Sequence, residues 1–135
     1  MTPRLLFLLG TAQRAVQRRM ARGDGAVTGA QAGVLFLLGD HRDMAIGDLA
    51  RALEATPSAM TELIDRMVDA GLIARRADAQ DGRVQRLALT PAGEAGRAAA
   101  LVKVTAANAT MCDGFTQAEI AVVARWLAAV RHRFA

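Results

Sequence analysis

Four arginines lie close together in the second half of the chain, between residues 75 and 86: Arg75, Arg76, Arg83 and Arg86. A guanidinium group donates paired hydrogen bonds to phosphate or to the edge of guanine, so this cluster suits contact with nucleic acid. Residues 72–74 are apolar and lead into Arg75 and Arg76, and apolar side chains recur within residues 84–89, so two short strands flank residues 77–83. Asp81 and Gly82 supply turn chemistry between them. The pattern predicts a β-hairpin that carries arginines. A solvated hairpin without a partner is the alternative that the cluster by itself leaves open.

The residues before this hairpin predict a helix over residues 57–70. Thr56 offers a side-chain oxygen to free helix amides, Pro57 suits the first turn, and Gly71 suits the end of the helix. Its apolar residues recur at three- and four-residue steps: Met60, Leu63, Ile64, Met67 and Val68. The opposite face is polar, and we expect four of its side chains to contact DNA: Ser58, Thr61, Glu62 and Arg66. Plain surface polarity, or local pairing of Asp65 and Arg66, each with a residue one helical turn away, is the alternative.

The arrangement of these elements predicts a winged helix-turn-helix. A short helix over residues 46–53 precedes the polar-faced helix, and the spacing between the two fits the turn of a helix-turn-helix. Helix 57–70 would lie in a DNA major groove, and the wing, residues 75–86, would reach the minor groove or the neighbouring backbone. We expect the wing to use Arg75, Arg76, Asp81, Arg83 and Arg86. The fold class is therefore mainly α (α+β), with a two-stranded wing.

Further helices flank this DNA-binding part, which we place at residues 28–90 of a single domain, 1–135. Thr28 with Gln31, and Thr116 with Glu119, have the spacing of capping boxes that begin helices. The last helix carries two apolar stripes, which one packing partner cannot cover. We therefore expect residues 1–22 and 91–135 to form a helical dimerisation region.

Charge is distributed unevenly along the 135 residues, whose net charge is +4. Residues 1–22 carry +5 and residues 72–90 carry +2, whereas residues 40–71 carry −4. Because neutralised phosphates supply much of the affinity for DNA, the wing and the first helix must supply most of the attraction. We expect modest, strongly salt-sensitive binding.

Other kinds of site find little support in the sequence. It holds no nucleophile elbow, phosphate-cradling loop or H-E-x-x-H motif, so we expect no enzymatic activity and no cofactor. His41 and His132 lack metal-ligand spacing, and we expect no metal.

Cys112 is the only cysteine, which fits a reducing compartment; we favour a buried inert thiol over a redox switch. No run has membrane-spanning length, so we expect a cytoplasmic protein with no membrane partner.

Ordered motifs over residues 27–96 resemble the MarR-type transcriptional regulators, the multiple antibiotic resistance regulator family. Its L-T-x-x-Q-x-x-V-L-x-x-L helix and its L-A pair are similar to Val27, Thr28, Gln31, Val34, Leu35, Leu38, Leu49 and Ala50. Its recognition helix and the step after it are similar to Thr61, Leu63, Ile64, Asp65, Arg66, Met67, Gly71, Leu72 and Ile73. Its D-x-R wing and its L-T-x-x-G motif are similar to Asp81, Arg83, Leu89, Thr90 and Gly93. The combined order and spacing make the resemblance specific.

The resemblance implies a homodimer that reads an inverted repeat in double-stranded DNA, acts as a repressor, and releases DNA when a small aromatic or anionic effector binds. It also implies that Arg83 enters the minor groove and that Asp81 orients it. One residue departs from the family pattern. Where many members have arginine, this chain has Glu62, which repels phosphate but is able to accept a hydrogen bond from cytosine N4.

Two other functions remain open at this point. The −4 charge on residues 40–71 and Glu62 suit a winged-helix protein-interaction module with weak or no DNA binding. A small-molecule carrier that uses only an inter-helix crevice is the third hypothesis.

Overall fold

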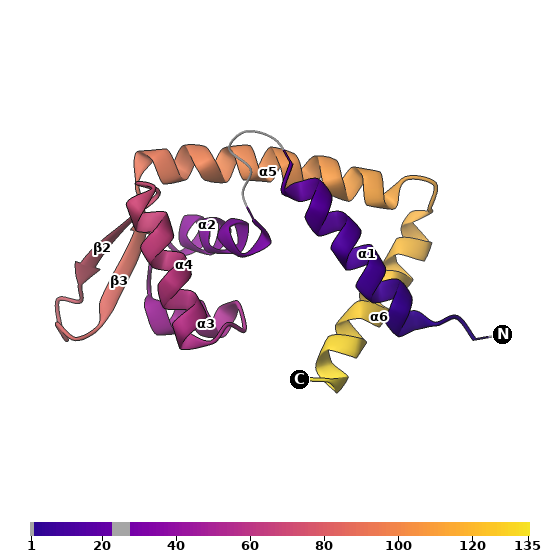
Figure 1. Cartoon of the computed structure of the whole chain (residues 1–135), viewed down its shortest axis with the longest axis horizontal. Helices are drawn as coiled ribbons and strands as arrows, with labels where there is room; N and C mark the ends of the chain where they lie inside the picture. Colours follow the sequence, from indigo (N-terminus) through magenta and orange to yellow (C-terminus); the bar gives the residue numbers. More distant parts are fainter. Residues whose placement is uncertain (1, 23–27) are drawn as a thin grey trace. The chain divides into compact units, whose positions relative to one another are not determined.

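The computed structural model describes residues 2–22 and 28–135. The chain divides into two compact units, residues 1–103 and 104–135. The first unit holds, in order, α1 (Leu5–Met20), α2 (Gly29–His41), β1 (Asp43–Ala45), α3 (Ile46–Ala52), α4 (Pro57–Asp69), β2 (Ile73–Ala77), β3 (Gln85–Leu89) and the first part of α5 (Pro91–Cys112) (Figure 1). The second unit holds the end of α5 and α6 (Gln117–Arg133). The mainly α class is confirmed, whereas Val27, one of the residues behind the family resemblance, lies outside the described residues.

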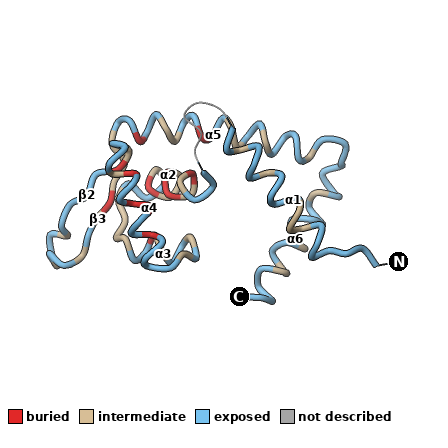
Figure 2. Tube along the Cα trace, in the orientation of Figure 1, coloured by how far each residue is buried: buried red, intermediate tan, exposed pale blue. Residues whose placement is uncertain are grey.

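The hydrophobic core of the first unit lies between α2, α3, α4 and the sheet. Figure 2 shows its buried positions on these elements. Its fully or almost fully buried members are Val34, Leu35, Leu38, Leu49, Met60, Leu63, Ile64, Met67, Ile73 and Leu87. Four of the five apolar residues predicted to form the stripe of α4 are among them, so the helix is anchored by this face and its polar face stays outside.

The sheet has three antiparallel strands in the order β1–β3–β2, one more than the predicted two-stranded wing. β2 and β3 form the expected hairpin, with Ile73 opposite Leu89 and Ala77 opposite Gln85. β1 adds a third strand, and Met44 lies opposite Leu87. A three-residue strand is too short to show an alternating pattern in the sequence.

The local signals for helix ends are confirmed. The Thr56 hydroxyl accepts a hydrogen bond from the Ala59 amide at 3.2 Å and caps α4. Capping boxes begin α2 at Thr28 and α6 at Thr116. Gly71 ends α4 with φ of +78°, a left-handed conformation that costs glycine little.

The start of α5 is joined closely to the end of α4. Thr90 accepts a hydrogen bond from the Gly93 amide at 3.0 Å, and its hydroxyl donates to the Gly71 carbonyl. A Cβ atom at Gly93 would lie 2.1 Å from the carbonyl oxygen of Leu72. Only glycine permits this approach. The close contact holds the residue before β2 against the start of α5.

The two terminal helices differ from the others, because neither α1 nor α6 has a fully buried residue in the single chain. Large apolar side chains on both are exposed, with Leu6 at 86% and Val122 at 52%. Among the described residues, no helix is long and apolar enough to cross a membrane.

Candidate nucleic-acid interface

The outer face of α4 carries all four predicted contact residues of this helix. Ser58, Thr61, Glu62 and Arg66 are exposed. The Thr61 hydroxyl donates to the Pro57 carbonyl at 2.9 Å, so its proton is already used and the oxygen is left to accept. Ser58 lies 3.5 Å from the Thr56 hydroxyl, with either oxygen able to donate.

The wing is tied to α4 by an ion pair. The Arg75 guanidinium on β2 donates to the Asp65 carboxylate on α4. The two side chains are 33% and 53% exposed, so the pair is reachable from solvent. The alternative from the sequence was that Asp65 and Arg66 each pair with a residue one helical turn away; the structure instead gives Asp65 a partner on the wing.

A second carboxylate, Asp43 on β1, holds two wing arginines. Arg76 donates to its Oδ2 at 2.6 Å, and Arg86 donates to its Oδ1. The hydrogen bonds from Arg86 and Arg76 lower the pKa of Asp43, and the same contact raises the pKa of Arg86. Asp43 thus crosslinks all three strands. Sequence reasoning missed this residue, since its partners lie far along the chain and no local pattern marks them.

The tip of the wing is built by two aspartates. The Asp78 carboxylate accepts hydrogen bonds from the Gln80 and Asp81 amides at 2.8 and 3.4 Å, and these bonds lower its pKa, the Gln80 bond most. Asp81 accepts from the amide and from Nε of Arg83 at 3.1 and 3.2 Å. The Arg83 side chain is 92% exposed, so it projects from the tip while Asp81 restrains its base. Asp78 was another residue that sequence reasoning missed.

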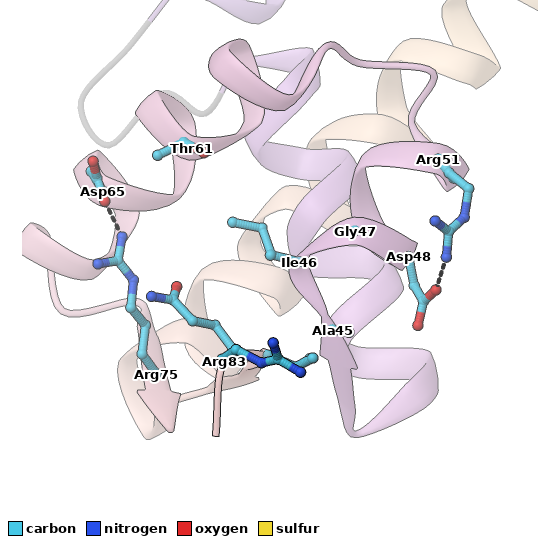
Figure 3. Close-up of a pocket in the computed structure, with 11 residues that line it drawn as sticks. Ala45, Ile46, Gly47, Asp48, Arg51, Thr61, Asp65, Arg75 and Arg83 are labelled. Carbon is cyan, nitrogen blue, oxygen red and sulfur yellow. Dashed lines mark hydrogen bonds and ion pairs between the residues drawn. The ribbon is translucent and has the colours of Figure 1, made fainter. Parts of the chain in front are cut away.

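A groove of about 550 Å³ brings the helix-turn-helix and the wing together. Its lining comes from β1 and α3, from α4 and from the wing: Ala45, Ile46, Gly47, Asp48, Arg51, Thr61, Asp65, Arg75, Arg83, Val84 and Gln85 (Figure 3). Arg51 pairs with Asp48 at its α3 side, and neither had been predicted as a site residue. The groove thus offers guanidinium donors from two sides and the Thr61 oxygen as an acceptor, a combination that suits a phosphate backbone or a base edge.

The predicted site residues fall into three sets. Ser58, Glu62 and Arg66 are exposed on α4 and are not part of the lining of the groove. Arg75, Thr61 and Arg83 border the groove, with Asp81 behind Arg83. Arg76 and Arg86 face Asp43 instead. Within the described part of the chain, no group of three or more His, Cys, Asp or Glu side chains is placed to hold a metal ion.

These features define a winged helix-turn-helix protein: an anchored helix with a free polar face, flanked by an arginine-tipped hairpin. The part of the chain that carries them is similar to the MarR family of transcriptional regulators. The sequence profile of that family matches residues 27–84.

Two curated relatives come from Bacillus subtilis (strain 168). The HTH-type transcriptional repressor MdtR is 40% identical over 68 residues, which are 50% of this chain and 44% of MdtR. The HTH-type transcriptional regulator YsmB is 36% identical over 98 residues, which are 73% of this chain and 65% of YsmB. The chain therefore matches less than two thirds of the length of either relative.

A solved structure shows how far the fold extends. The crystal structure of the S. aureus MepR–DNA complex superposes with a TM-score of 0.91, over 98% of this chain and 99% of the MepR chain. Because the sequence identity is only 20%, this likeness shows a shared fold but does not by itself show a shared role. The winged helix-turn-helix predicted from the sequence is confirmed.

Proposed function

We propose that this protein is a sequence-specific DNA-binding transcriptional regulator that acts as a repressor. In this proposal α4 enters the major groove, and the wing reaches the adjacent minor groove through Arg83. The observation that carries the proposal is the groove on the protein surface described above. Thr61, on the outer face of α4, and Arg83, whose side chain is 92% exposed, both line it. If a DNA backbone occupied this groove of the protein, the bases would lie beside α4 and the minor groove of the DNA would lie beside the wing.

The relatives support the same proposal. MdtR is a transcriptional repressor, and MepR shares this fold and was crystallised with DNA. Such a regulator acts where the chromosome lies, so we place the protein in the cytoplasm.

We further propose that the working form is a homodimer that reads an inverted repeat. The support is the unsatisfied apolar surface of α1, of α6 and of the residue that follows α6. In addition to Leu6 and Val122, Phe7 is 63% exposed, and Phe134, directly after α6, is 87% exposed. Exposed apolar side chains in such number on terminal helices mark an association surface. A two-fold axis in the protein would be matched by a palindromic operator.

A small aromatic or anionic effector that lowers the affinity for DNA completes the proposal, on the strength of the family resemblance. Titrating a set of aromatic carboxylates into the protein–operator complex would test it. An effector must reduce DNA affinity and must also bind the free protein, because linkage is reciprocal.

The test of DNA binding is a titration monitored by fluorescence anisotropy, with the intergenic DNA upstream of the protein's own gene and a scrambled duplex of the same composition. Two salt concentrations are needed, because non-specific binding is almost wholly electrostatic. We expect tighter binding to the intergenic DNA at both. Equal binding to both duplexes, or none even at low salt, would contradict the proposal.

A winged-helix protein-interaction module is the second candidate, favoured by the ion pairs that the wing arginines form within the protein. Three of its four arginines are held by Asp43 and Asp65, and residues 40–71 carry −4. This arrangement reduces the free positive charge facing a duplex. A protein complex that survives high salt, together with absent DNA binding, would favour this second function.

A further inference from the structure

The exposed face of α4 has few side chains free to read bases. Thr61 has committed its only proton to Pro57, and Asp65 is paired with Arg75. Of the other outward residues in the first three turns, Glu62 and Arg66 have no ion-pair partner among the described residues. The spacing of four would allow these two to pair with each other, yet none of the ion pairs among the described residues joins them.

Glu62 lies near the middle of this outer face. Helix residues advance by about 100° each, so Glu62 projects roughly opposite the buried line formed by Met60, Ile64 and Met67. Residues in the N-terminal part of a recognition helix are the ones that approach base edges. Glu62 is therefore the charged side chain that a major groove would meet first.

A carboxylate in that position limits which base sequences α4 is able to bind. It is repelled by phosphates, and it loses water on entering the groove, so it must find a hydrogen-bond donor there. The major groove offers two base donors, cytosine N4 and adenine N6. Beside adenine N6 lies the acceptor N7, which repels the second carboxylate oxygen, whereas cytosine has no acceptor in that place.

We propose that Glu62 is a specificity-determining residue that selects a cytosine at one position of each operator half-site. The inference rests on the proposed DNA-binding function and names the base chemistry of that site. Glu62 also rejects other sequences, because any base without a matched donor leaves its carboxylate desolvated and unpaired. The acidic residue thereby contributes selectivity at the cost of general affinity.

The experiment is selection from a random duplex library followed by sequencing, with wild-type protein and two variants, Glu62→Gln and Glu62→Ala. Wild type should select cytosine at one symmetric pair of positions, with roughly tenfold preference over thymine, which presents an acceptor there. Glu62→Gln should change this preference to adenine, since an amide supplies both the donor and the acceptor that adenine N7 and N6 require. Glu62→Ala should lose preference at that position and bind unselected DNA more tightly.

The matched control is Glu94→Gln, which removes an exposed carboxylate from α5 and should leave the selected motif unchanged. Thermal unfolding of each variant confirms folding before selection. If wild type selects a motif and Glu62→Gln selects the same one, the role of Glu62 is refuted while DNA recognition stands. If wild type selects no motif, both the inference and the proposed function are overturned.

Discussion

The carboxylate of Asp43 on β1 accepts a hydrogen bond from the guanidinium of Arg86 on β3, forty-three residues later in the chain. The same carboxylate accepts from Arg76 on β2 at 2.6 Å. The Asp43 side chain is 29% exposed, so this contact, at the base of the wing, is partly shielded from solvent. Asp43 therefore ties both strands of the hairpin to β1.

Asp43→Asn should destabilise the fold at neutral pH, and the difference from wild type should disappear in acid. The pKa of Asp43 is lowered in the folded state, so its contribution is present above the unfolded pKa of about 3.9 and is lost as pH falls through the lower folded value. Urea unfolding between pH 7 and pH 2.5 measures this. Asp69→Asn, which neutralises an exposed carboxylate at the end of α4, is the control and should not reproduce the pH dependence.

Arg83→Ala should weaken DNA binding without affecting folding. The side chain is 92% exposed, so its removal changes stability by less than about 0.5 kcal/mol. Loss of its DNA contact should cost about 1–3 kcal/mol and reduce the salt dependence of binding by about one counterion. Anisotropy titrations over a salt series give both quantities. Arg133→Ala removes the same charge from the last turn of α6 and should leave affinity nearly unchanged; equal losses in both variants would assign the effect to net charge.

Local signals in the sequence predicted the elements that position the site. Thr56, Pro57 and Gly71 act on backbone groups within a few residues, so the ends of α4 could be located without knowing the fold. The apolar period of α4 also identified which face is free.

The side-chain pairings could not be predicted in this way. Asp43 meets Arg76 and Arg86 across 33 and 43 residues, and only the strand register brings them together. The sequence shows an arginine cluster, whereas the fold pairs three of its members with carboxylates outside the hairpin, on α4 and β1. Arg83 pairs with Asp81 at the tip of the wing, and its side chain projects into solvent. Contact of the predicted residues with DNA stays a prediction.

Leu6→Glu should convert the proposed dimer to monomer. Leu6 is 86% exposed in the single chain, and a charge placed in an apolar interface would be desolvated without a partner. Sedimentation velocity across a concentration series measures the change, and DNA affinity should fall with it because both half-sites are no longer bound together. The control is Ala15→Glu, about two and a half turns further along α1 and so on its opposite side. A wild-type protein that sediments as a monomer at every concentration would contradict the dimer.

Two glycines of α5, three residues apart, should respond oppositely to alanine. At Gly93 the new Cβ atom would meet the Leu72 carbonyl oxygen at 2.1 Å, and backbone cannot move aside as a flexible side chain does, so Gly93→Ala should destabilise by about 1–3 kcal/mol or more. At Gly96 the nearest atoms, in Leu72 and Leu35, are 3.7 and 3.8 Å away, which is ordinary contact. Gly96→Ala should therefore be neutral or stabilise by up to about 1 kcal/mol through helix propensity. Chemical unfolding of the two variants and wild type decides the matter. Equal gains in both would show that α5 does not press against the end of α4, and the wing would then lack the support that holds it beside α4.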